Sequence, residues 1–420
     1  MEEKENCISE YLTSEKEEID ISPHLKEEQI KFGEILNQNK TVKKLNLNIE
    51  YLSIEGIEKI SESLKTNKNI EEICFMYNKI REKGTKFLSE ALKFNSSLKK
   101  INLYENFIQV EGVKDLSESL MINTSLKKLN LSVNYFGNEG IIYFSKMLIK
   151  NNSLKEFSVS ETYFDDKGLK HLIDALKCNS FVESIDISFN RFEKEGIDMI
   201  SHFLKQKNCK IKKLYISLWS DDFNVNNSFC ESLNQFSSLK DISIDILKEN
   251  MALIKTISEN LKTNSTLKSL NLKENEINDE CMKYIYESFE FNSHLEIFKC
   301  QNNIFDKSRA KNKFVQMLKK NKSLKKIKLD CYSNELDFLL NCNILWKSSI
   351  HSNLFVEFKV QIFCLLCCLK ENERTKKLKI PKFVLFEIIK KVDRKSFFPF
   401  IFKKRNSKNK KRKRLCKRNF

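Results

Sequence analysis

The segment Leu98-Lys-Lys-Ile-Asn-Leu-Tyr-Glu-Asn106 recurs along the whole middle of the chain. We take Ile101, the residue after the two lysines, as the anchor of this copy. Equivalent anchors are apolar and follow one another at 28 residues, or 29 at two steps: Leu45, Ile73, Ile101, Leu129, Phe157, Ile185, Leu214, Ile242, Leu270, Phe298 and Ile327. The residue two positions later is also mostly apolar. This alternation predicts a short strand with one buried face in every copy.

An asparagine stands five positions after most anchors. It is found at Asn78, Asn106, Asn134, Asn190, Asn275 and Asn303. A turn buried between repeats leaves backbone groups unpaired, at about 1–3 kcal/mol each. An amide side chain can both donate to and accept from such groups. We therefore expect these asparagines to pair with the backbone of adjacent repeats.

Glycines mark the same period. Six of the eight glycines are 28 residues apart, at positions 56, 84, 112, 140, 168 and 196. One position in each repeat therefore needs either an unusual backbone angle or a close approach of two chain segments. After Gly112, the residues Val113, Leu116 and Leu120 have the spacing of a helix with one apolar face. Each repeat is predicted to be a strand, a turn, a helix and a second turn.

These features resemble the ribonuclease-inhibitor-type leucine-rich repeat. Ribonuclease inhibitor, Ran GTPase-activating proteins, NLR receptors and tropomodulin-like caps carry such repeats. The resemblance covers about residues 40–335. It implies an α/β solenoid (horseshoe) of about 11 repeats of 28 residues, with an inner parallel sheet and outer helices. One repeat alone cannot be stable, but a stack of repeats can.

The pattern divides the chain into four segments. Residues 1–22 form an acidic N-terminal segment, and residues 23–341 form the repeat domain, beginning with a capping helix at 23–39. Residues 342–402 are rich in Phe, Leu and Cys and are expected to be helical. They are either a plain C-terminal cap or a docking segment that resembles an F-box or SOCS-box. Residues 403–420 form a basic tail that we expect to be disordered.

Two repeats depart from the pattern, those anchored at Leu214 and Ile242. They lack the phase glycine, and Trp219 and Leu247 replace the asparagine. Either this zone has drifted within a tolerant repeat, or it is a reshaped contact surface.

Composition and charge limit the cellular setting. The start of the chain is acidic, without an apolar run of the signal-peptide kind, and the longest strongly apolar run is far shorter than the ~20 residues of a membrane span. The 13 cysteines show no regular framework. We therefore expect a monomer inside the cell, in the cytoplasm, the nucleus or both. Asn-x-Ser/Thr triplets at Asn95, Asn123 and Asn151 are one repeat apart, so repeat geometry explains them better than glycosylation does.

No pattern of catalytic chemistry occurs in the sequence. It lacks a phosphate-binding glycine loop, a metalloprotease motif and a nucleophile elbow. The five histidines have no metal-ligand partner at close spacing, and the 28-residue spacing of the glycines cannot cradle one phosphate. We expect no enzymatic activity, no cofactor and no metal site.

A binding surface can be mapped from the strand pattern. The residues one and three positions after each anchor, and the turn residue that follows, should face the inside of the horseshoe. Polar residues with a few aromatics there are typical of a protein-contact surface. The candidates are Met76, Tyr77, Tyr104, Glu105, Asn130, Glu161, Asp186, Phe189 and Tyr215.

The basic tail suggests a second type of contact. The chain has a net charge of +17, and the eleven Lys and Arg residues at 403–420 account for most of it, leaving +6 on the rest. The tail has the form of a nuclear localisation signal that binds an import receptor, through Lys403, Lys404, Arg405, Lys410, Lys411, Arg412, Lys413 and Arg414. It has no regular aromatic residues for base stacking, so we do not expect specific nucleic-acid recognition.

Three functions fit these observations. The first is a non-enzymatic scaffold that binds protein partners on its concave face. The second is a ubiquitin-ligase substrate receptor that docks through residues 358–392. The third is a Ran-type GTPase activator, which the fold resemblance implies. Arg81 lies after an early strand as that activity would require, but the basic tail departs from the acidic C-terminal region typical of that family.

Overall fold

A computed structural model of the chain describes residues 11, 13–21, 25–47, 52–219, 223–246, 251–330, 336, 340 and 343. It divides into two units, Met1–Leu336 and Asp337–Phe420. Apart from residue 343, the proposed cap or docking segment and the basic tail lie outside the described residues. The description below therefore concerns the first unit.

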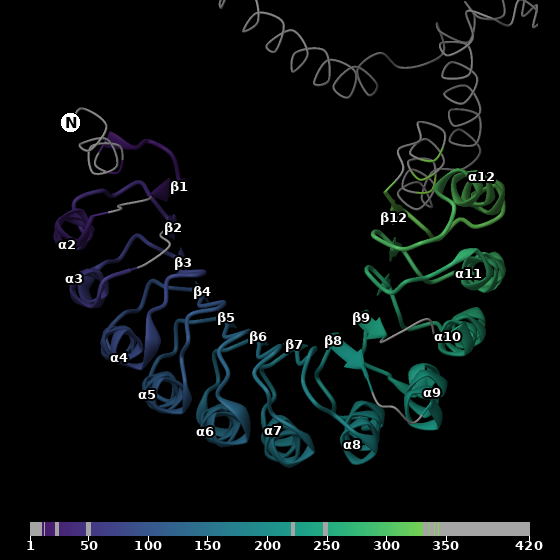
Figure 1. Cartoon of the computed structure of the whole chain (residues 1–420), viewed down its shortest axis with the longest axis horizontal. Helices are drawn as coiled ribbons and strands as arrows, with labels where there is room; N and C mark the ends of the chain where they lie inside the picture. Colours follow the sequence, from purple (N-terminus) through teal and green to yellow (C-terminus); the bar gives the residue numbers. More distant parts are fainter. Residues whose placement is uncertain are drawn as a thin grey trace, which may run out of the picture. The chain divides into compact units, whose positions relative to one another are not determined.

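One parallel sheet runs through the unit, with its strands in chain order (Figure 1). The strands are β1 (Glu18–Ile21), β2 (Lys44–Leu47), β3 (Glu72–Cys74), β4 (Lys100–Asn102), β5 (Lys128–Asn130), β6 (Glu156–Ser158), β7 (Ser184–Asp186), β8 (Lys213–Leu218), β9 (Asp241–Ile246), β10 (Ser269–Asn271), β11 (Ile297–Lys299) and β12 (Lys326–Lys328). Anchors of adjacent repeats are directly paired, for example Ile73 with Ile101. The register is therefore the sequence repeat itself.

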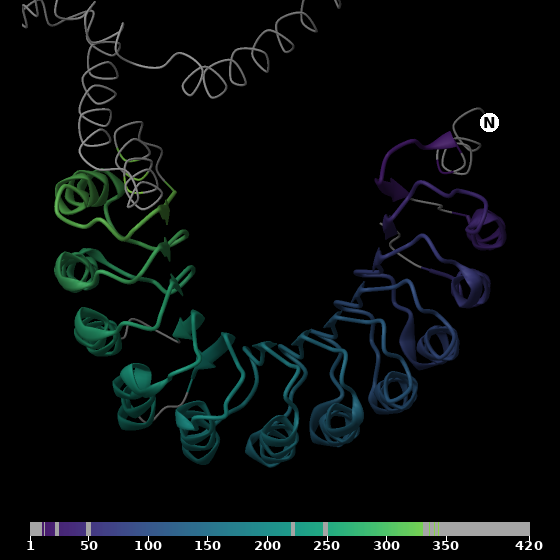
Figure 2. The ribbon, with the colours of Figure 1, turned by 180° about the vertical axis from the view of Figure 1, so that it is seen from behind.

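A helix follows each strand from β1 to β11 and lies on the outer side of the arc formed by this unit, while the strands line the inner side (Figures 1 and 2). The helices are α2 (Lys26–Ile35), α3 (Ile54–Thr66), α4 (Arg81–Leu92), α5 (Val110–Leu120), α6 (Gly137–Lys150), α7 (Asp166–Cys178), α8 (Lys194–Lys205), α9 (Phe223–Glu231) with the 3₁₀ helix η1 (Ser232–Gln235), α10 (Met251–Thr263), α11 (Asp279–Phe291) and α12 (Lys307–Leu318). The predicted α/β leucine-rich-repeat solenoid is confirmed.

The N-terminal end differs from the expectation in one respect. The predicted capping helix is present as α2, but a strand precedes it within the segment assigned to an acidic N-terminus. β1 pairs with β2 in the register Ile19 to Leu45. Glu-Ile-Asp-Ile alternates polar and apolar residues as a strand should, yet it lacks the two lysines that mark the other anchors. The sheet therefore begins before residue 23.

The core lies between the sheet and the helices. Ten of the eleven anchors are buried, and only Ile327, on the last strand, is partly exposed. The predicted helix stripe Val113, Leu116 and Leu120 is buried in α5. Burying an aliphatic side chain contributes about 1.5–3 kcal/mol, and in this arrangement a repeat buries its side chains against its neighbours.

The turn asparagines pair with the backbone as predicted. Asn134 Nδ2 donates to the carbonyl of Leu103 in the previous repeat at 2.8 Å, and its Oδ1 accepts from the amides of Asn106 and Ile108 at 3.0 Å each. Asn190 makes the same donation to Val159 at 2.8 Å. Both side chains are buried. The amides therefore join adjacent repeats at the end of each strand.

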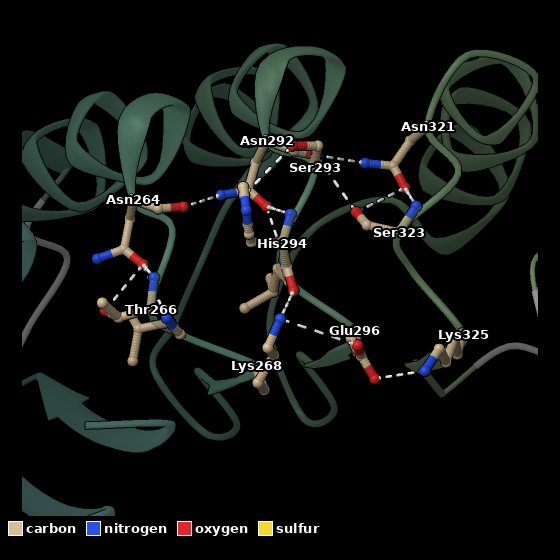
Figure 3. Close-up of polar contacts among 12 residues, drawn as sticks. Asn264, Thr266, Lys268, Asn292, Ser293, His294, Glu296, Asn321, Ser323 and Lys325 are labelled. Atoms are coloured by element: carbon tan, nitrogen blue, oxygen red, sulfur yellow. Dashed lines mark hydrogen bonds and ion pairs between the residues drawn. The ribbon is translucent and has the colours of Figure 1, made fainter. Parts of the chain in front are cut away.

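A second row of asparagines lies where the helices end (Figure 3). Asn292 Nδ2 donates to the carbonyl of Leu261, at the end of the previous helix, at 2.6 Å, and to the carbonyl of Asn264 at 3.0 Å. Asn321 continues the row with a 2.9 Å bond to the carbonyl of Asn292. Asn95, Asn123 and Asn151 occupy the same position, and their Nδ2 atoms are buried donors. These bonds give the Asn-x-Ser/Thr triplets a structural role.

The phase glycines serve close approach rather than an unusual backbone angle. Gly168 lies in the first turn of α7 without positive φ, and a Cβ there would lie 2.5 Å from Asn138 Oδ1 and 2.7 Å from Ile141 Cγ2 of α6. Asn138 cannot easily move, because its Oδ1 accepts from the amides of Asp165 and Gly168 at 3.0 and 3.1 Å. Any side chain at position 168 would push α7 away from α6.

The two irregular repeats are built differently. β8 and β9 each span six residues and stay paired from Lys213 with Asp241 to Leu218 with Ile246. Elsewhere the strand stops after three or four residues and the turn asparagine takes over the backbone bonds. Without that asparagine the strands continue, so this zone has a distinct geometry. Leu247 lies outside the described residues.

Candidate functional site

The inner face of the sheet carries the residues that flank each anchor. Asn130 and Asp186 directly follow an anchor and are half-buried, and Met76 lies three residues after one. Asn130 also has a structural role, because its Oδ1 accepts from the amide of Ser132 at 2.9 Å. The candidate residues on the strands therefore share one face, although part of their polar capacity is used within the fold.

The turns after the strands have an unusual backbone. Residues on either side of the turn asparagine adopt positive φ although they are not glycine. They include Tyr77 (63°), Glu105 (52°), Tyr135 (52°), Glu161 (52°), Tyr163 (66°) and Phe189 (56°). The left-handed region is uncommon for such residues. The amides of Glu105 and Glu161 donate to the carbonyls of Ser132 and Ser188 in the next repeat, at 3.0 and 3.1 Å, which ties these turns in place.

These turns hold a row of aromatic side chains, which we call the aromatic row: Tyr77, Tyr104, Tyr135, Tyr163, Phe189 and Trp219. Ring centroids are 5.3 Å apart for Tyr77 and Tyr104, 5.1 Å for Tyr135 and Tyr163, and 5.0 Å for Phe189 and Trp219. Tyr77, Tyr135, Tyr163 and Phe189 are exposed at 51%, 43%, 46% and 41%. Large aromatics exposed in succession are typical of interaction sites.

The sequence pattern did not identify three members of this row. Tyr135 and Tyr163 stand six positions after their anchors, beyond the last turn position that the strand pattern placed on the inner face. Trp219 stood out only as a replacement for the turn asparagine. The signal for the first two was available, because Phe107, Tyr135 and Tyr163 are aromatic at the same 28-residue spacing.

Carboxylates lie among the aromatic residues. Burial raises the pKa of Tyr104, and the neighbouring Tyr77, Glu105 and Glu161 raise it further. Burial also raises the pKa of Tyr135, with added contributions from Glu161, Tyr163 and Glu105. The two glutamates are therefore close enough to affect tyrosines on more than one repeat.

Two half-buried aspartates extend the negative surface toward the irregular repeats. Asp186 accepts hydrogen bonds from the hydroxyls of Ser158 at 2.9 Å and Ser188 at 2.6 Å. Burial nevertheless raises the pKa of Asp186. Burial, together with the charge of Asp186, raises the pKa of Asp245 to about 6, although the Ser217 hydroxyl donates to it at 3.4 Å. These hydroxyl donors are neutral, so they leave the charge of both carboxylates uncancelled.

Tyr215 lies on β8 beside these aspartates and is 40% exposed. Burial raises the pKa of Tyr215, and the charges of Asp186, Glu156 and Asp241 raise it further. The candidate residues from Tyr77 to Tyr215 thus lie on the six consecutive repeats from β3 to β8, each on the inner face or on the turn that follows it.

The rims of the sheet are charged differently. At the strand starts, lysines pair with acids of adjacent strands, as in Lys100–Glu72 at 3.4 Å and Lys128–Glu156 at 2.8 Å. Lys268 and Lys325 both approach Glu296, at 3.9 and 2.6 Å (Figure 3). At the C-terminal end of the sheet, burial and then the charges of Lys328, Lys326 and Lys213 lower the pKa of Lys299, against an opposing effect of Asp241.

Nothing on the described part of the chain assembles a reaction centre of the kinds sought in the sequence. Arg81 is an exposed residue that begins α4, with its amide bonded to the carbonyl of Asn106 at 2.9 Å. Across the described residues, no group of three His, Cys, Asp or Glu side chains is placed to hold a metal ion. None of the described helices combines the length and apolar character needed to cross a membrane.

Comparison with known proteins agrees on the repeat. The family model described as Leucine Rich repeat matches residues 123–145, 178–201 and 263–285. No curated protein matches the sequence. The ribonuclease-inhibitor-like, Ran-activator-like or NLR-type assignment stays a prediction.

Several solved structures are similar to this chain. One is the leucine-rich repeat-containing protein LegL7 from Legionella pneumophila, with 13% identity, a TM-score of 0.49, and coverage of 71% of this chain and 96% of that one. The tropomodulin C-terminal domain from Caenorhabditis elegans gives 21% identity, a TM-score of 0.30, and coverage of 36% and 92%. TLR13, solved as a TLR13-ssRNA13 complex, gives 17% identity, a TM-score of 0.43, and coverage of 71% and 40%.

Proposed function

We propose that this leucine-rich-repeat protein is a non-enzymatic scaffold that binds a protein partner across the inner face of strands β3–β9. The aromatic row is the observation that carries the proposal. Its side chains are exposed, come from successive repeats and contact one another in pairs. Rigid aromatic anchors supply a large contact area at low entropic cost.

The backbone supports this proposal. Holding a non-glycine residue at positive φ costs about 1–3 kcal/mol, and the fold accepts this cost at Tyr77, Tyr135, Tyr163 and Phe189. The turns therefore present the aromatic side chains in one fixed arrangement. A surface ordered before binding loses less conformational entropy when the partner arrives.

The experiment is affinity capture from the source cell with full-length protein. Wild-type protein is compared with the Tyr135→Ser/Phe189→Ser variant, which removes two exposed rings. The matched control is Phe94→Ser, which removes a more exposed ring, at 65%, beyond the end of α4. We expect partners that the wild type and the control capture and that the double variant loses. The same partners with all three proteins would contradict the proposal.

More specific roles rest on residues that the structure does not describe. For Lys403, Lys404, Arg405, Lys410, Lys411, Arg412, Lys413 and Arg414 we propose binding to an import receptor, and removal of residues 403–420 should then abolish nuclear accumulation. The ligase-receptor and GTPase-activator alternatives have no additional support from the described residues. A monomer is the proposed state, to be tested by light scattering of the full chain.

A further inference from the structure

The acids of the inner face fall into two groups. At the strand starts, Glu72, Glu156 and Asp241 each have a lysine of an adjacent strand within 3.4, 2.8 and 3.5 Å. At the turns, Glu105 and Glu161 have no ion pair with any residue that the structure describes. The fold thus neutralises one row of carboxylates and leaves the row beside the tyrosines without a cation.

The half-buried aspartates belong to the second group. Asp186 is held by the hydroxyls of Ser158 and Ser188, and Asp245 by the hydroxyl of Ser217. Hydroxyl groups orient a carboxylate but do not cancel its charge. Removing carboxylates from water without a nearby cation is unfavourable. A cationic ligand would relieve that cost on binding.

The chain itself contains an example of the contact that such a ligand would make. The guanidinium carbon of Arg191 lies 5.3 Å from the centroid of the Tyr163 ring. Tyr135 packs against the other member of this pair with 5.1 Å between ring centroids, and its own ring is 43% exposed. The Tyr135 face is thus a second aromatic surface of the same kind. Cations over tyrosine faces gain about 0.5–1 kcal/mol at exposed sites.

The spacing of the sites suggests the conformation of the ligand. Glu105 and Glu161 occupy equivalent turn positions two repeats apart, and adjacent strands are about 4.8 Å apart. Their separation is therefore about 10 Å, which is the length of three residues of extended chain, at ~3.3 Å each. An extended segment crossing the strands with arginine at every third position would match both glutamates.

Resting on the proposed function, we propose that the turn face of β4–β7 binds an extended, arginine-bearing polypeptide segment. Its arginines stack on Tyr135 and Tyr163 and pair with Glu105 and Glu161. Arginine suits this site better than lysine does, because its planar guanidinium group both stacks on aromatic rings and pairs with carboxylates. A nucleic acid would instead bring phosphates against unneutralised carboxylates.

The test measures peptide binding to the full-length protein by fluorescence anisotropy. The probe is a labelled 12-residue peptide with arginine at every third position and Gly or Ser elsewhere. Two further peptides carry lysine or glutamate at the same positions. The charge variant is Glu105→Gln/Glu161→Gln. Its matched control is Glu118→Gln/Glu195→Gln, which removes two exposed acids from α5 and α8.

We expect the charge variant to bind the arginine peptide about 5-fold more weakly, as two exposed charge pairs would give. The control variant should bind like wild type. Tyr135→Ser/Tyr163→Ser should weaken arginine-peptide binding by a similar factor and lysine-peptide binding by less. None of these variants should weaken binding of the glutamate peptide, because that peptide is attracted to basic parts of the chain.

The proposal is overturned if the arginine peptide does not bind, or if the charge variant and its control bind it equally. It is also overturned if Tyr135→Ser/Tyr163→Ser weakens binding of a single-stranded oligonucleotide but not of the arginine peptide. The proposed function fails separately. If captured partners still depend on Tyr135 and Phe189 while the peptide result is negative, the surface binds protein of a different chemistry.

Discussion

At the residue scale, the polar side chain of Asn134 is used completely by the backbone. Its Nδ2 atom donates to the carbonyls of Leu103, Leu131 and Ser132 at 2.8, 2.9 and 3.1 Å, and its Oδ1 atom accepts from two amides. The side chain is fully buried. One amide thus satisfies backbone groups of its own repeat and of the previous one at the point where the strand ends.

Asn134→Ala should lower the free energy of unfolding by about 3 kcal/mol, because buried backbone groups lose their partners at about 1–3 kcal/mol each. Urea unfolding followed by circular dichroism measures the change. The control is Asn152→Ala at an exposed position, where we expect a change within about 0.5 kcal/mol. Equal stability of the two variants would show that water can replace the Asn134 amide.

Asp245 gives the residue scale a pH dependence. Its pKa is raised from 3.8 to about 6 by burial and by the charges of Asp186 and Glu274. The folded protein therefore binds more protons than the unfolded chain between these values, and this group's contribution to stability improves as the pH falls through 6. Above that pH the charged carboxylate destabilises the fold.

Asp245→Asn should therefore be more stable than wild type at pH 7.5, by about 1 kcal/mol after allowance for partial exposure. The difference should shrink as the pH is lowered toward 4. Thermal unfolding across this range measures it, with the exposed Asp198→Asn of α8 as the control. A difference that stays constant with pH would mean that the Asp245 carboxyl is not the titrating group.

At the scale of the element, the distance between helices depends on the phase glycines. Gly168 allows the first turn of α7 to lie against α6, where Asn138 and Ile141 occupy the space that a Cβ would need. Asn138 also donates to the carboxylate of Asp165, the N-cap of α7, at 2.8 Å. Helix capping and helix packing therefore depend on the same few atoms.

Gly168→Ala should destabilise the protein by about 1–3 kcal/mol, as overpacking of a filled site does, although alanine is the better helix former. Chemical denaturation provides the measurement, and Lys170→Ala on the exposed side of α7 is the control. A stabilised Gly168→Ala protein would indicate that α6 and α7 separate without cost.

At the scale of the whole unit, stability comes from neighbouring repeats. Strands pair in chain order, and successive helices pack on one another. In such an array stability is roughly the sum of repeat and interface contributions. One complete repeat should then be removable, provided that the phase of the array is kept.

Deleting residues 95–122 joins Phe94 to Asn123, which occupies the position of Asn95 one repeat later. We expect this protein to remain folded, with unchanged ellipticity per residue and a lower unfolding midpoint. Deleting only residues 95–108 puts strand residues out of register and should abolish cooperative unfolding. If both deletions behaved alike, the array would not be modular at this point.

The sequence alone determined the parts of the structure that each repeat encodes locally. Buried anchors such as Ile101, the backbone bonds of Asn106 and the apolar stripe of α5 all follow from side-chain type at a fixed position, because the same chemistry recurs every 28 residues. The fold class and the parallel register could be predicted for this reason. The inner face, though not its full set of exposed residues, could be assigned from the same alternation.

The tertiary structure decided what depends on contact between repeats. It brought Tyr135 against Tyr163 and put Trp219 on Phe189. It chose close approach over an unusual backbone angle at Gly168, and it added β1. The physical reason is that such contacts depend on turn dihedrals and on how one repeat is stacked on the next. A linear pattern contains the period of the repeats but not the direction in which a turn presents its side chains.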